Sequence, residues 1–96
     1  MKKFGIRYLP EAKNAAKKLP PEIKPRVRGG IEELLHNPFA GKELVDELSN
    51  FRSLAIGTYR VIYLIIEEES LIEIHFIGHR RDVYANFKEL LKTIKR

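Results

Sequence analysis

The sequence predicts an α+β domain in which an antiparallel β-sheet carries two N-terminal helices on one face and is followed by a C-terminal helix. Three observations favour this class. Hydrophobic periodicity gives the order strand, helix, helix, strand, strand, strand, helix. The last three strands are joined by short turns, which is typical of an antiparallel meander. The 96 residues are the size of one compact domain, so we expect a single domain over residues 1–96.

The N-terminal residues predict one strand and one helix. Apolar side chains alternate over residues 4–8, and the strand stops at Pro10. Residues 10–19 then carry apolar side chains at helical spacing, with Lys13 and Lys17 on the opposite, basic side.

A second helix is expected within residues 19–38. Its weak point is the pair Gly29 and Gly30, because each glycine costs about 1 kcal/mol relative to alanine inside a helix. A close contact with another helix or with the sheet would explain the pair.

Three further strands are expected at residues 52–56, 59–66 and 71–77, after an irregular connection over residues 37–51. The acidic residues 67–70 form the turn between the last two strands. Strict alternation in the last strand would place Ile72, Ile74 and Phe76 on one face, and Glu73, His75 and Ile77 on the other.

Charge is distributed unevenly along the chain. Residues 1–30 hold nine Lys or Arg and two acidic residues, residues 31–77 hold three and nine, and residues 78–96 hold six and two. The last segment includes a helix expected over residues 82–96. If the two basic ends meet, they form one positive surface suited to a phosphate backbone, and the alternative is an ordinary solvated basic exterior.

The composition excludes several classes of protein. There is no cysteine, so neither a disulfide framework nor a thiolate metal site is available, and three scattered histidines do not predict a metal site. The longest apolar runs are about six residues, too short to span a bilayer, and the N-terminus lacks the apolar region of a secretory signal. We therefore expect a cytoplasmic protein with no membrane segment, metal or other cofactor.

Arg60 stands out because it lies near the start of an otherwise apolar strand, GTYRVIYLII, residues 57–66. Removing a guanidinium from water without a partner costs several kcal/mol. Arg60 is therefore expected either to pair with a buried carboxylate, from Asp46, Glu47 or Glu73, or to lie at an open face of the sheet and meet an anionic ligand.

The segment GHRRDVY, residues 78–84, is expected to join Arg60 in space. In a hairpin that turns near Glu68, Arg60 falls opposite the region of Ile77. Cations gathered there repel one another unless an anion is bound, and a phosphate is the obvious candidate. RNA also brings its own nucleophile, the 2′-hydroxyl, so cleavage needs a proton acceptor, cations around the crowded phosphorane and a proton donor, without requiring a metal.

These residues carry a resemblance to a known family. The run RSLAIGTYRVIYLIIEEESLIEIHFIGHRRDVY resembles the C-terminal half of the RelE/ParE superfamily of bacterial and archaeal toxins, and the N-terminal strand and helices are similar too. The most specific parts are G-x-Y-R-V-I-Y and G-H-R-R-x-V-Y. RelE-like members are ribosome-dependent endoribonucleases that cut mRNA in the ribosomal A site and are neutralised by a cognate antitoxin.

The resemblance implies roles for individual residues. Arg60 and Arg80 would stabilise the transition-state phosphate, and Tyr84 would stack on a base or assist proton transfer unless its ring is buried under the helix. His79 is a further candidate acid or base, with a structural hydrogen bond as the alternative. Arg81 is a candidate for substrate binding, or alternatively part of an exposed local ion pair.

Other cations are candidates for holding RNA, and one expected cation is missing. Lys13 and Lys17 lie on a basic helix that would grip ribosomal RNA. Ala55 occupies a place where many RelE-like proteins have Arg or Lys, so reduced activity is expected. Arg52 would replace that cation only if the strand bulges, because its offset from Ala55 puts its side chain on the other face.

The resemblance also implies partners. These are a RelB-like antitoxin, in a toxin–antitoxin hetero-oligomer, and the ribosome with its A-site mRNA. An apolar groove on the helix and sheet surface is expected to hold an acidic or amphipathic antitoxin helix. Two alternatives share the fold: a ParE-like toxin that inhibits DNA gyrase by binding, and a degenerate toxin that binds only its antitoxin or DNA. The basic cluster at Arg60 favours the nuclease.

Overall fold

The computed structural model describes residues 3–94, which form three α-helices and one five-stranded sheet. No helix in this part of the chain is both long and apolar enough to cross a membrane. Short 3₁₀ turns lie at Pro38–Ala40, Asp46–Leu48 and Glu67–Glu69. In chain order the main elements are β1 (Gly5–Tyr8), α1 (Pro10–Lys17), α2 (Lys24–Glu33), β2 (Lys42–Glu43), β3 (Phe51–Ile56), β4 (Tyr59–Ile66), β5 (Leu71–His79) and α3 (Val83–Ile94).

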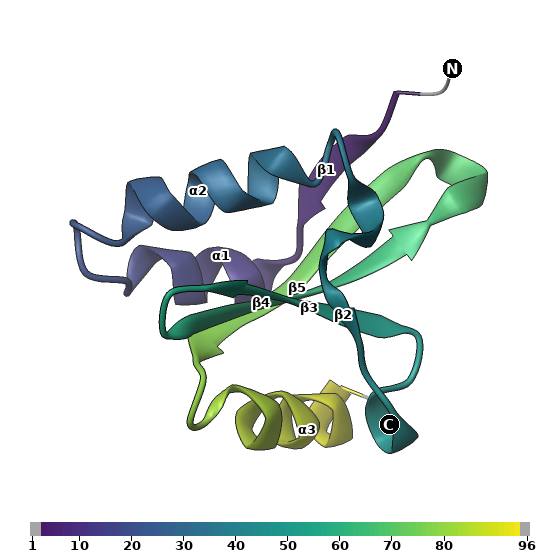
Figure 1. The fold of residues 1–96 in the computed structure, drawn as a ribbon. Coiled ribbons are helices and arrows are strands. Elements are labelled where there is room, and N and C mark those ends of the chain that lie inside the picture. Colours follow the sequence, from purple (N-terminus) through teal and green to yellow (C-terminus); the bar gives the residue numbers. More distant parts are fainter. Residues whose placement is uncertain (1–2, 95–96) are drawn as a thin grey trace.

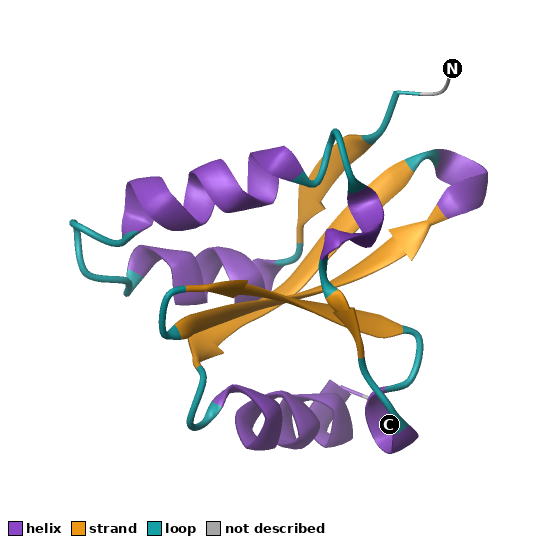
Figure 2. Ribbon diagram, in the orientation of Figure 1, coloured by secondary structure: helices purple, strands orange, loops and turns teal. Residues whose placement is uncertain are grey.

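The sheet separates two helical layers. Its strand order is β1-β5-β4-β3-β2. Helices α1 and α2 cover one face, and α3 covers the other (Figure 1). Figure 2 shows the sheet in orange between these helices. The arrangement confirms the α+β class, the N-terminal helix pair on one face and the C-terminal helix.

Two features of the sheet differ from the prediction. β1 runs parallel to β5, with Gly5 beside Leu71, so the sheet is mixed rather than wholly antiparallel. β2 lies in the segment expected to be irregular and pairs Lys42 with Ser53. Alternation along a sequence identifies a strand but not its partner, and a two-residue strand is too short to show any alternation.

Each face of the sheet has its own hydrophobic core, and the central strand β4 contributes to both. Val61 and Tyr63 lie under α1 and α2, whereas Ile62 lies under α3. The buried residues on the α1 and α2 side are Ala12, Leu19, Val27, Ile31, Leu34, Val61, Tyr63, Ile72, Ile74 and Ile77. Those on the α3 side are Leu48, Ile62, Val83 and Phe87.

A β-bulge in β5 interrupts the alternation of its side chains. The register between β4 and β5 shifts between Ile62 and Tyr63, which leaves His75 as the extra residue. Beyond it, Phe76 packs in the α3-side core and Ile77 in the core under α1 and α2. The predicted faces of these two residues are therefore wrong, because strict alternation cannot anticipate a bulge.

Gly30 lets α2 approach the end of β3 closely. A Cβ atom at Gly30 would lie 2.5 Å from Cδ1 of Ile56, whereas one at Gly29 would meet nothing within 4 Å. The expected helix–sheet contact is confirmed for Gly30, while Gly29 faces open space.

Alanine at these two glycines should change stability in opposite directions. In Gly30→Ala the added methyl must displace Ile56, so we expect the free energy of unfolding to fall by about 1–3 kcal/mol. In Gly29→Ala the methyl meets no atom and the entropic cost of glycine is removed, so we expect a gain of about 0.5–1 kcal/mol. Urea denaturation of both variants measures the difference, and equal effects would contradict the contact between α2 and β3.

Candidate functional site

The turn between β3 and β4 holds Arg60 in place. Gly57 in this turn has a φ of +59°, a left-handed conformation that favours glycine. The Nη1 atom of Arg60 donates hydrogen bonds to the carbonyl oxygens of Gly57, at 3.1 Å, and Tyr59, at 2.9 Å. The side chain is half-buried, so these carbonyls replace part of its lost hydration.

Arg60 has no carboxylate partner among residues 3–94. Glu73 instead binds Arg7 and His75, and Glu47 pairs with a lysine of α3. The interpretation of Arg60 as half of a buried ion pair is therefore wrong. Within residues 3–94, hydrogen bonds to two carbonyl groups are the interactions that compensate its charge.

Arg80 and Arg81 lie beside the same turn. The amide of Arg80 donates to the carbonyl oxygen of Thr58 at 2.7 Å, which keeps β5 joined to the turn one residue beyond its end. Arg60 is opposite Gly78, one residue beyond the expected position. Both Arg80 and Arg81 are exposed, and neither forms an ion pair within the described part of the chain. We refer to Arg60, Arg80 and Arg81 as the arginine rim.

Ala55 lies directly across β3 from Arg60 and is exposed. Paired residues of neighbouring strands project from the same face of the sheet. A longer side chain at position 55 would therefore lie next to Arg60. Position 55, where a cation is expected from the sequence, therefore lies on the same face of the sheet as Arg60.

Tyr84, in the first turn of α3, reaches across to β3. Its hydroxyl oxygen lies 2.9 Å from Oγ of Ser53, and its half-buried ring packs against the α3-side core. Ser53 is two residues from Ala55 and shares its face. The ring of Tyr84 is thus packed under the helix while its hydroxyl lies on the face that carries Arg60.

His79 faces a different neighbour. Its ring meets that of Tyr59 edge to face, with centroids 5.6 Å apart, and Tyr59 packs in the core under α1 and α2. The Nδ1 atom of His79 accepts a hydrogen bond from the amide of Arg81 at 3.2 Å. A neutral imidazole that accepts at Nδ1 carries its proton on Nε2. The structure does not bring this ring together with the Arg60 guanidinium.

Three predicted substrate-binding residues lie away from the arginine rim. Nε of Arg52 donates to the carbonyl oxygen of Gly41 at 3.0 Å, and its guanidinium lies over the ring of Phe39, 5.2 Å from the centroid. Because β3 pairs with β4 without a bulge, Arg52 keeps to the other face and does not replace the missing cation. Lys13 and Lys17 border a groove between the two N-terminal helices.

We refer to this hollow as the α1–α2 groove. Its volume is about 400 Å³, and its floor is apolar. The floor is formed by Tyr8, Ala16, Leu19, Val27, Ile31 and Ile77, and the border by Lys13, Lys17, Lys24 and Arg28.

Sequence reasoning missed two residues that the fold brings to the β3–β4 turn and the Arg60 face. Ser53 carries the hydrogen bond to Tyr84, and nothing in its strand pattern distinguished it. The guanidinium of Arg26, on α2, lies beside Gly57. Arg26 was one basic residue among several on its helix, so only the packing of α2 could single it out. Among residues 3–94, no group of three His, Asp or Glu side chains is placed to hold a metal ion.

The sequence matches known toxins over most of its length. Residues 6–84 match the family described as the ParE toxin of the type II toxin–antitoxin system parDE. The toxin RelG of Mycobacterium tuberculosis is 34% identical over 83 residues, which cover 84% of this chain and 95% of that protein.

Solved structures share the fold. A chain of the toxin–antitoxin complex RelBE2 from Mycobacterium tuberculosis is 32% identical, with a TM-score of 0.76, and the match covers 82% of this chain and all (100%) of that one. The isolated RelE toxin of E. coli has a TM-score of 0.69 at 15% identity, over 97% of this chain and 100% of that one. The archaeal RelE–RelB complex from Pyrococcus horikoshii gives a TM-score of 0.67 at 20% identity, over 82% and 97%. The last two show a likeness of fold alone.

A mixed sheet between two helical layers, with arginines gathered at one end, is thus the architecture of a toxin. The chain belongs to the RelE/ParE superfamily of toxins from type II toxin–antitoxin systems. This confirms the resemblance seen in the sequence.

Away from the arginine rim, Arg7, Glu73 and His75 form a chain of polar contacts. Arg7 binds Glu73, which also lies 3.1 Å from Nε2 of His75. The hydrogen bond from Arg7 lowers the pKa of Glu73 below its ordinary value. The ring of His75 packs edge to face against Phe51, and burial lowers the pKa of His75 although Glu73 partly opposes this.

We expect acidification to destabilise the fold through His75. Because its folded pKa lies below the ordinary 6.5, the unfolded chain takes up the proton first, and stability is lost as the pH falls from about 6.5 through the folded pKa. The free energy of unfolding should fall with a slope of at most about 1.4 kcal/mol per pH unit for this proton. His75→Gln should flatten the dependence between pH 7 and 5, measured by urea denaturation. His36→Gln, at an exposed histidine, is the control and should retain it.

Proposed function

We propose that this toxin is a metal-independent endoribonuclease that acts in the cytoplasm and cleaves mRNA in the A site of the ribosome. The observation that carries the proposal is the arginine rim, in which three arginines gather at one end of the sheet without an ion-pair partner in residues 3–94. Such a cluster is favourable only when an anion joins it. The RNA backbone supplies a phosphate at every nucleotide.

In this mechanism the scissile phosphate binds against Arg60 and Arg80. The ribose 2′-hydroxyl passes its proton through the hydroxyl of Tyr84 to water and attacks the adjacent phosphorus. The bond to the 5′-oxygen of the next nucleotide breaks, that oxygen takes a proton from water, and a 2′,3′-cyclic phosphate remains. Negative charge grows on the phosphate oxygens during the attack, and guanidinium groups held in place stabilise it. The carbonyls of the β3–β4 turn hold the Arg60 guanidinium before the substrate arrives.

Proton transfer in this mechanism draws on Tyr84, and His79 contributes a hydrogen bond to the RNA. The hydrogen bond to Ser53 fixes the hydroxyl of Tyr84 on the Arg60 face, where it contacts the reacting nucleotide. His79 carries its neutral-state proton on Nε2, because Nδ1 accepts from the Arg81 amide. Nε2 is therefore suited to donate a hydrogen bond to RNA, and because the ring lies beside Tyr59, on the face away from Arg60, it contacts a part of the strand other than the scissile phosphate.

Ala55 leaves the Arg60 face one cation short of the family pattern. Removing one donor that stabilises a developing oxyanion typically costs about 10²–10³ in kcat. We infer that this toxin cleaves slowly for this reason.

Restoring the cation should accelerate cleavage. We expect Ala55→Arg to raise the rate by at least about 10-fold and Arg60→Gln to lower it by about 100-fold, because each changes the positive charge next to the phosphorane. Primer extension on mRNA translated in a reconstituted reaction measures both rates. Lys3→Gln removes the same charge before β1, at the other end of the sheet from the β3–β4 turn, and we expect no change from this control.

Gyrase inhibition is the second candidate, and the ParE description of the matched family favours it. Two results together would favour gyrase inhibition over the nuclease: the Ala55→Arg variant leaves mRNA intact, and the purified toxin inhibits DNA supercoiling.

We also propose that the α1–α2 groove binds an acidic, amphipathic helix of a RelB-type antitoxin. RelE toxins have been solved in complexes with RelB antitoxins, which supports a partner of this class. The apolar floor fits the apolar face of a helix, and four cations on the border fit carboxylates beside that face.

Reversing the charge of the groove border should weaken antitoxin binding. We expect Lys17→Glu combined with Arg28→Glu to reduce affinity by more than about 10-fold, because like charges placed together cost several kcal/mol. Titration calorimetry with the RelB-type antitoxin encoded with this toxin measures it. The control combines Lys42→Glu and Lys92→Glu, which change the net charge equally, and equal losses in both double variants would contradict the groove as the docking site.

A further inference from the structure

Arg26 reaches the same turn as Arg60. Its Nη2 atom lies 3.4 Å, and its Nη1 atom 3.6 Å, from the position that a Cβ atom on Gly57 would occupy. Nη1 of Arg60 donates to the carbonyl oxygen of the same glycine at 3.1 Å. Two guanidinium groups therefore converge on one residue of the turn.

The packing of α2 fixes this position. Gly30, four residues after Arg26, contacts Ile56, and residues four apart lie on the same side of a helix. Ile56 directly precedes Gly57. The contact that seats α2 on the end of β3 thus also carries Arg26 to the turn, where its guanidinium lies within van der Waals reach of Gly57.

The two arginines approach from opposite faces of the sheet. Arg26 comes from α2, which packs on the face that holds Val61 and Tyr63. Arg60 shares its face with Ala55, Ser53 and the α3-side core. The β3–β4 turn lies between the two guanidinium groups. A linear ligand can therefore pass over the turn from one face of the sheet to the other.

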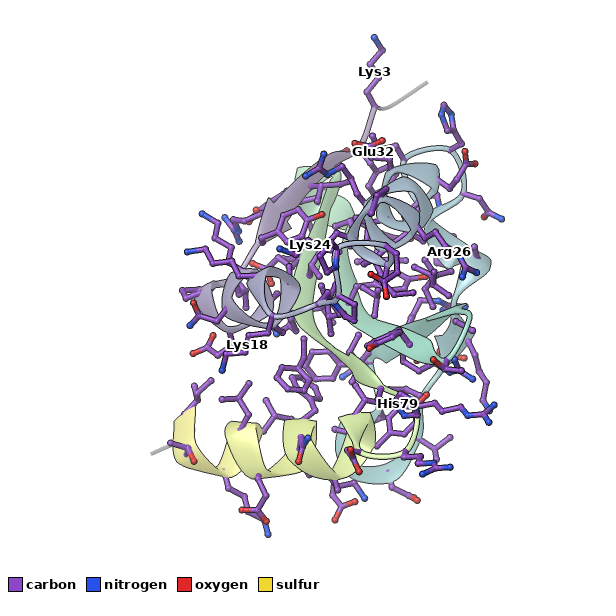
Figure 3. All side chains as sticks on the ribbon, turned by 90° about the vertical axis from the view of Figure 1, so that its left-hand side faces the viewer. Lys3, Lys18, Lys24, Arg26, Glu32 and His79 are labelled. Carbon is purple, nitrogen blue, oxygen red and sulfur yellow. The ribbon has the colours of Figure 1, made fainter. Side chains whose placement is uncertain are left out.

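Neither guanidinium is neutralised by an ion pair within residues 3–94. Figure 3 views the molecule from the side of this turn and shows Lys18, Lys24 and Arg26 together on that side, above His79. The positive field therefore extends from the arginine rim around the turn to the helix pair. A ligand with several regularly spaced negative charges fits this field better than a single anion does.

We propose that Arg26 binds the backbone phosphate of a nucleotide next to the cleaved one, so that the RNA strand crosses the β3–β4 turn from the Arg60 face to the α2 face. This rests on the proposed nuclease function and adds a residue that the rim does not contain. Because the two arginines approach the turn from opposite faces of the sheet, the proposal assigns them different phosphates. Arg26 touches no reacting atom and acts as a positioning residue through binding.

The salt dependence of RNA binding tests the contact. The probe is a fluorescent single-stranded RNA with 2′-O-methyl riboses, which cannot be cleaved, and binding is followed by anisotropy. Each phosphate contact on a single strand contributes about 0.7 to the slope of log K against log salt concentration. With an oligonucleotide of about 12 nucleotides, Arg26→Gln should lower the slope by about 0.7 and weaken binding about 5-fold. An oligonucleotide of about 3 nucleotides is too short to cross the turn, so with this probe the slope and the affinity of Arg26→Gln should equal those of the unmodified toxin.

Two matched variants separate contact from bulk charge. Arg26→Lys keeps the charge and should keep the slope, whereas Lys3→Gln removes a charge at the other end of the sheet, before β1, and should not change it. In ribosomal cleavage, Arg26→Gln should raise KM with little change in kcat, in contrast to the fall in kcat expected for Arg60→Gln. Arg26 is exposed, so the thermal unfolding of its variants should match that of the unmodified toxin.

Equal slopes for Arg26→Gln and Lys3→Gln at both lengths would overturn the proposal. The proposal would also be overturned if the unmodified toxin showed no salt-dependent binding to the RNA probe. Cleavage of mRNA on the ribosome is tested separately, by primer extension. Failure of the nuclease function has a different signature. In that case the mRNA ends seen in the primer-extension assay would be the same for the unmodified toxin and for Arg60→Gln.

Discussion

The Arg60 guanidinium is held by two carbonyl oxygens of its own turn, and the rest of the site depends on this constraint. A buried carboxylate would have neutralised the side chain and withdrawn it from any ligand. Carbonyl groups orient the guanidinium while leaving its net charge intact. The left-handed conformation of Gly57 is what turns the chain so that its carbonyl can accept this hydrogen bond. The fixed position of this positive charge at the end of the sheet is therefore a product of turn geometry.

The same turn organises the other basic residues. The amide of Arg80 is bound to the carbonyl of Thr58, and Arg26 contacts Gly57 because α2 is seated on Ile56. The acidic turn Glu67–Glu69 lies at the other end of β4, which separates the two signs of charge along one strand (Figure 1). The arginine rim and the acidic turn thus lie at opposite ends of the sheet, and the field at the rim end is positive.

The two helical layers have different relations to the site. On the α3 side, the hydrogen bond between Tyr84 and Ser53 joins the start of the helix to β3 close to Ala55, so the position of α3 and the chemistry of the Arg60 face are coupled. On the other side, α1 and α2 form the groove with a basic border and also deliver Arg26 to the turn. A partner bound in that groove would lie on the helix pair that positions Arg26. The proposed antitoxin groove and the proposed RNA contact of Arg26 are therefore adjacent in this fold, although they use different side chains.

Much of the architecture followed from the sequence. The periods of the apolar residues defined the helices and the long strands, and the short turns defined the antiparallel meander, because both depend on local geometry. The gathering of Arg60 and Arg80 followed as well, since a hairpin fixes which strand ends meet. Tertiary structure alone decided the parallel pairing of β1, the bulge at His75, the ring contacts of His79 and the approach of Arg26 to Gly57. Each of these depends on contacts between segments far apart in the chain, and no local spacing encodes which of several equivalent surfaces will pack together.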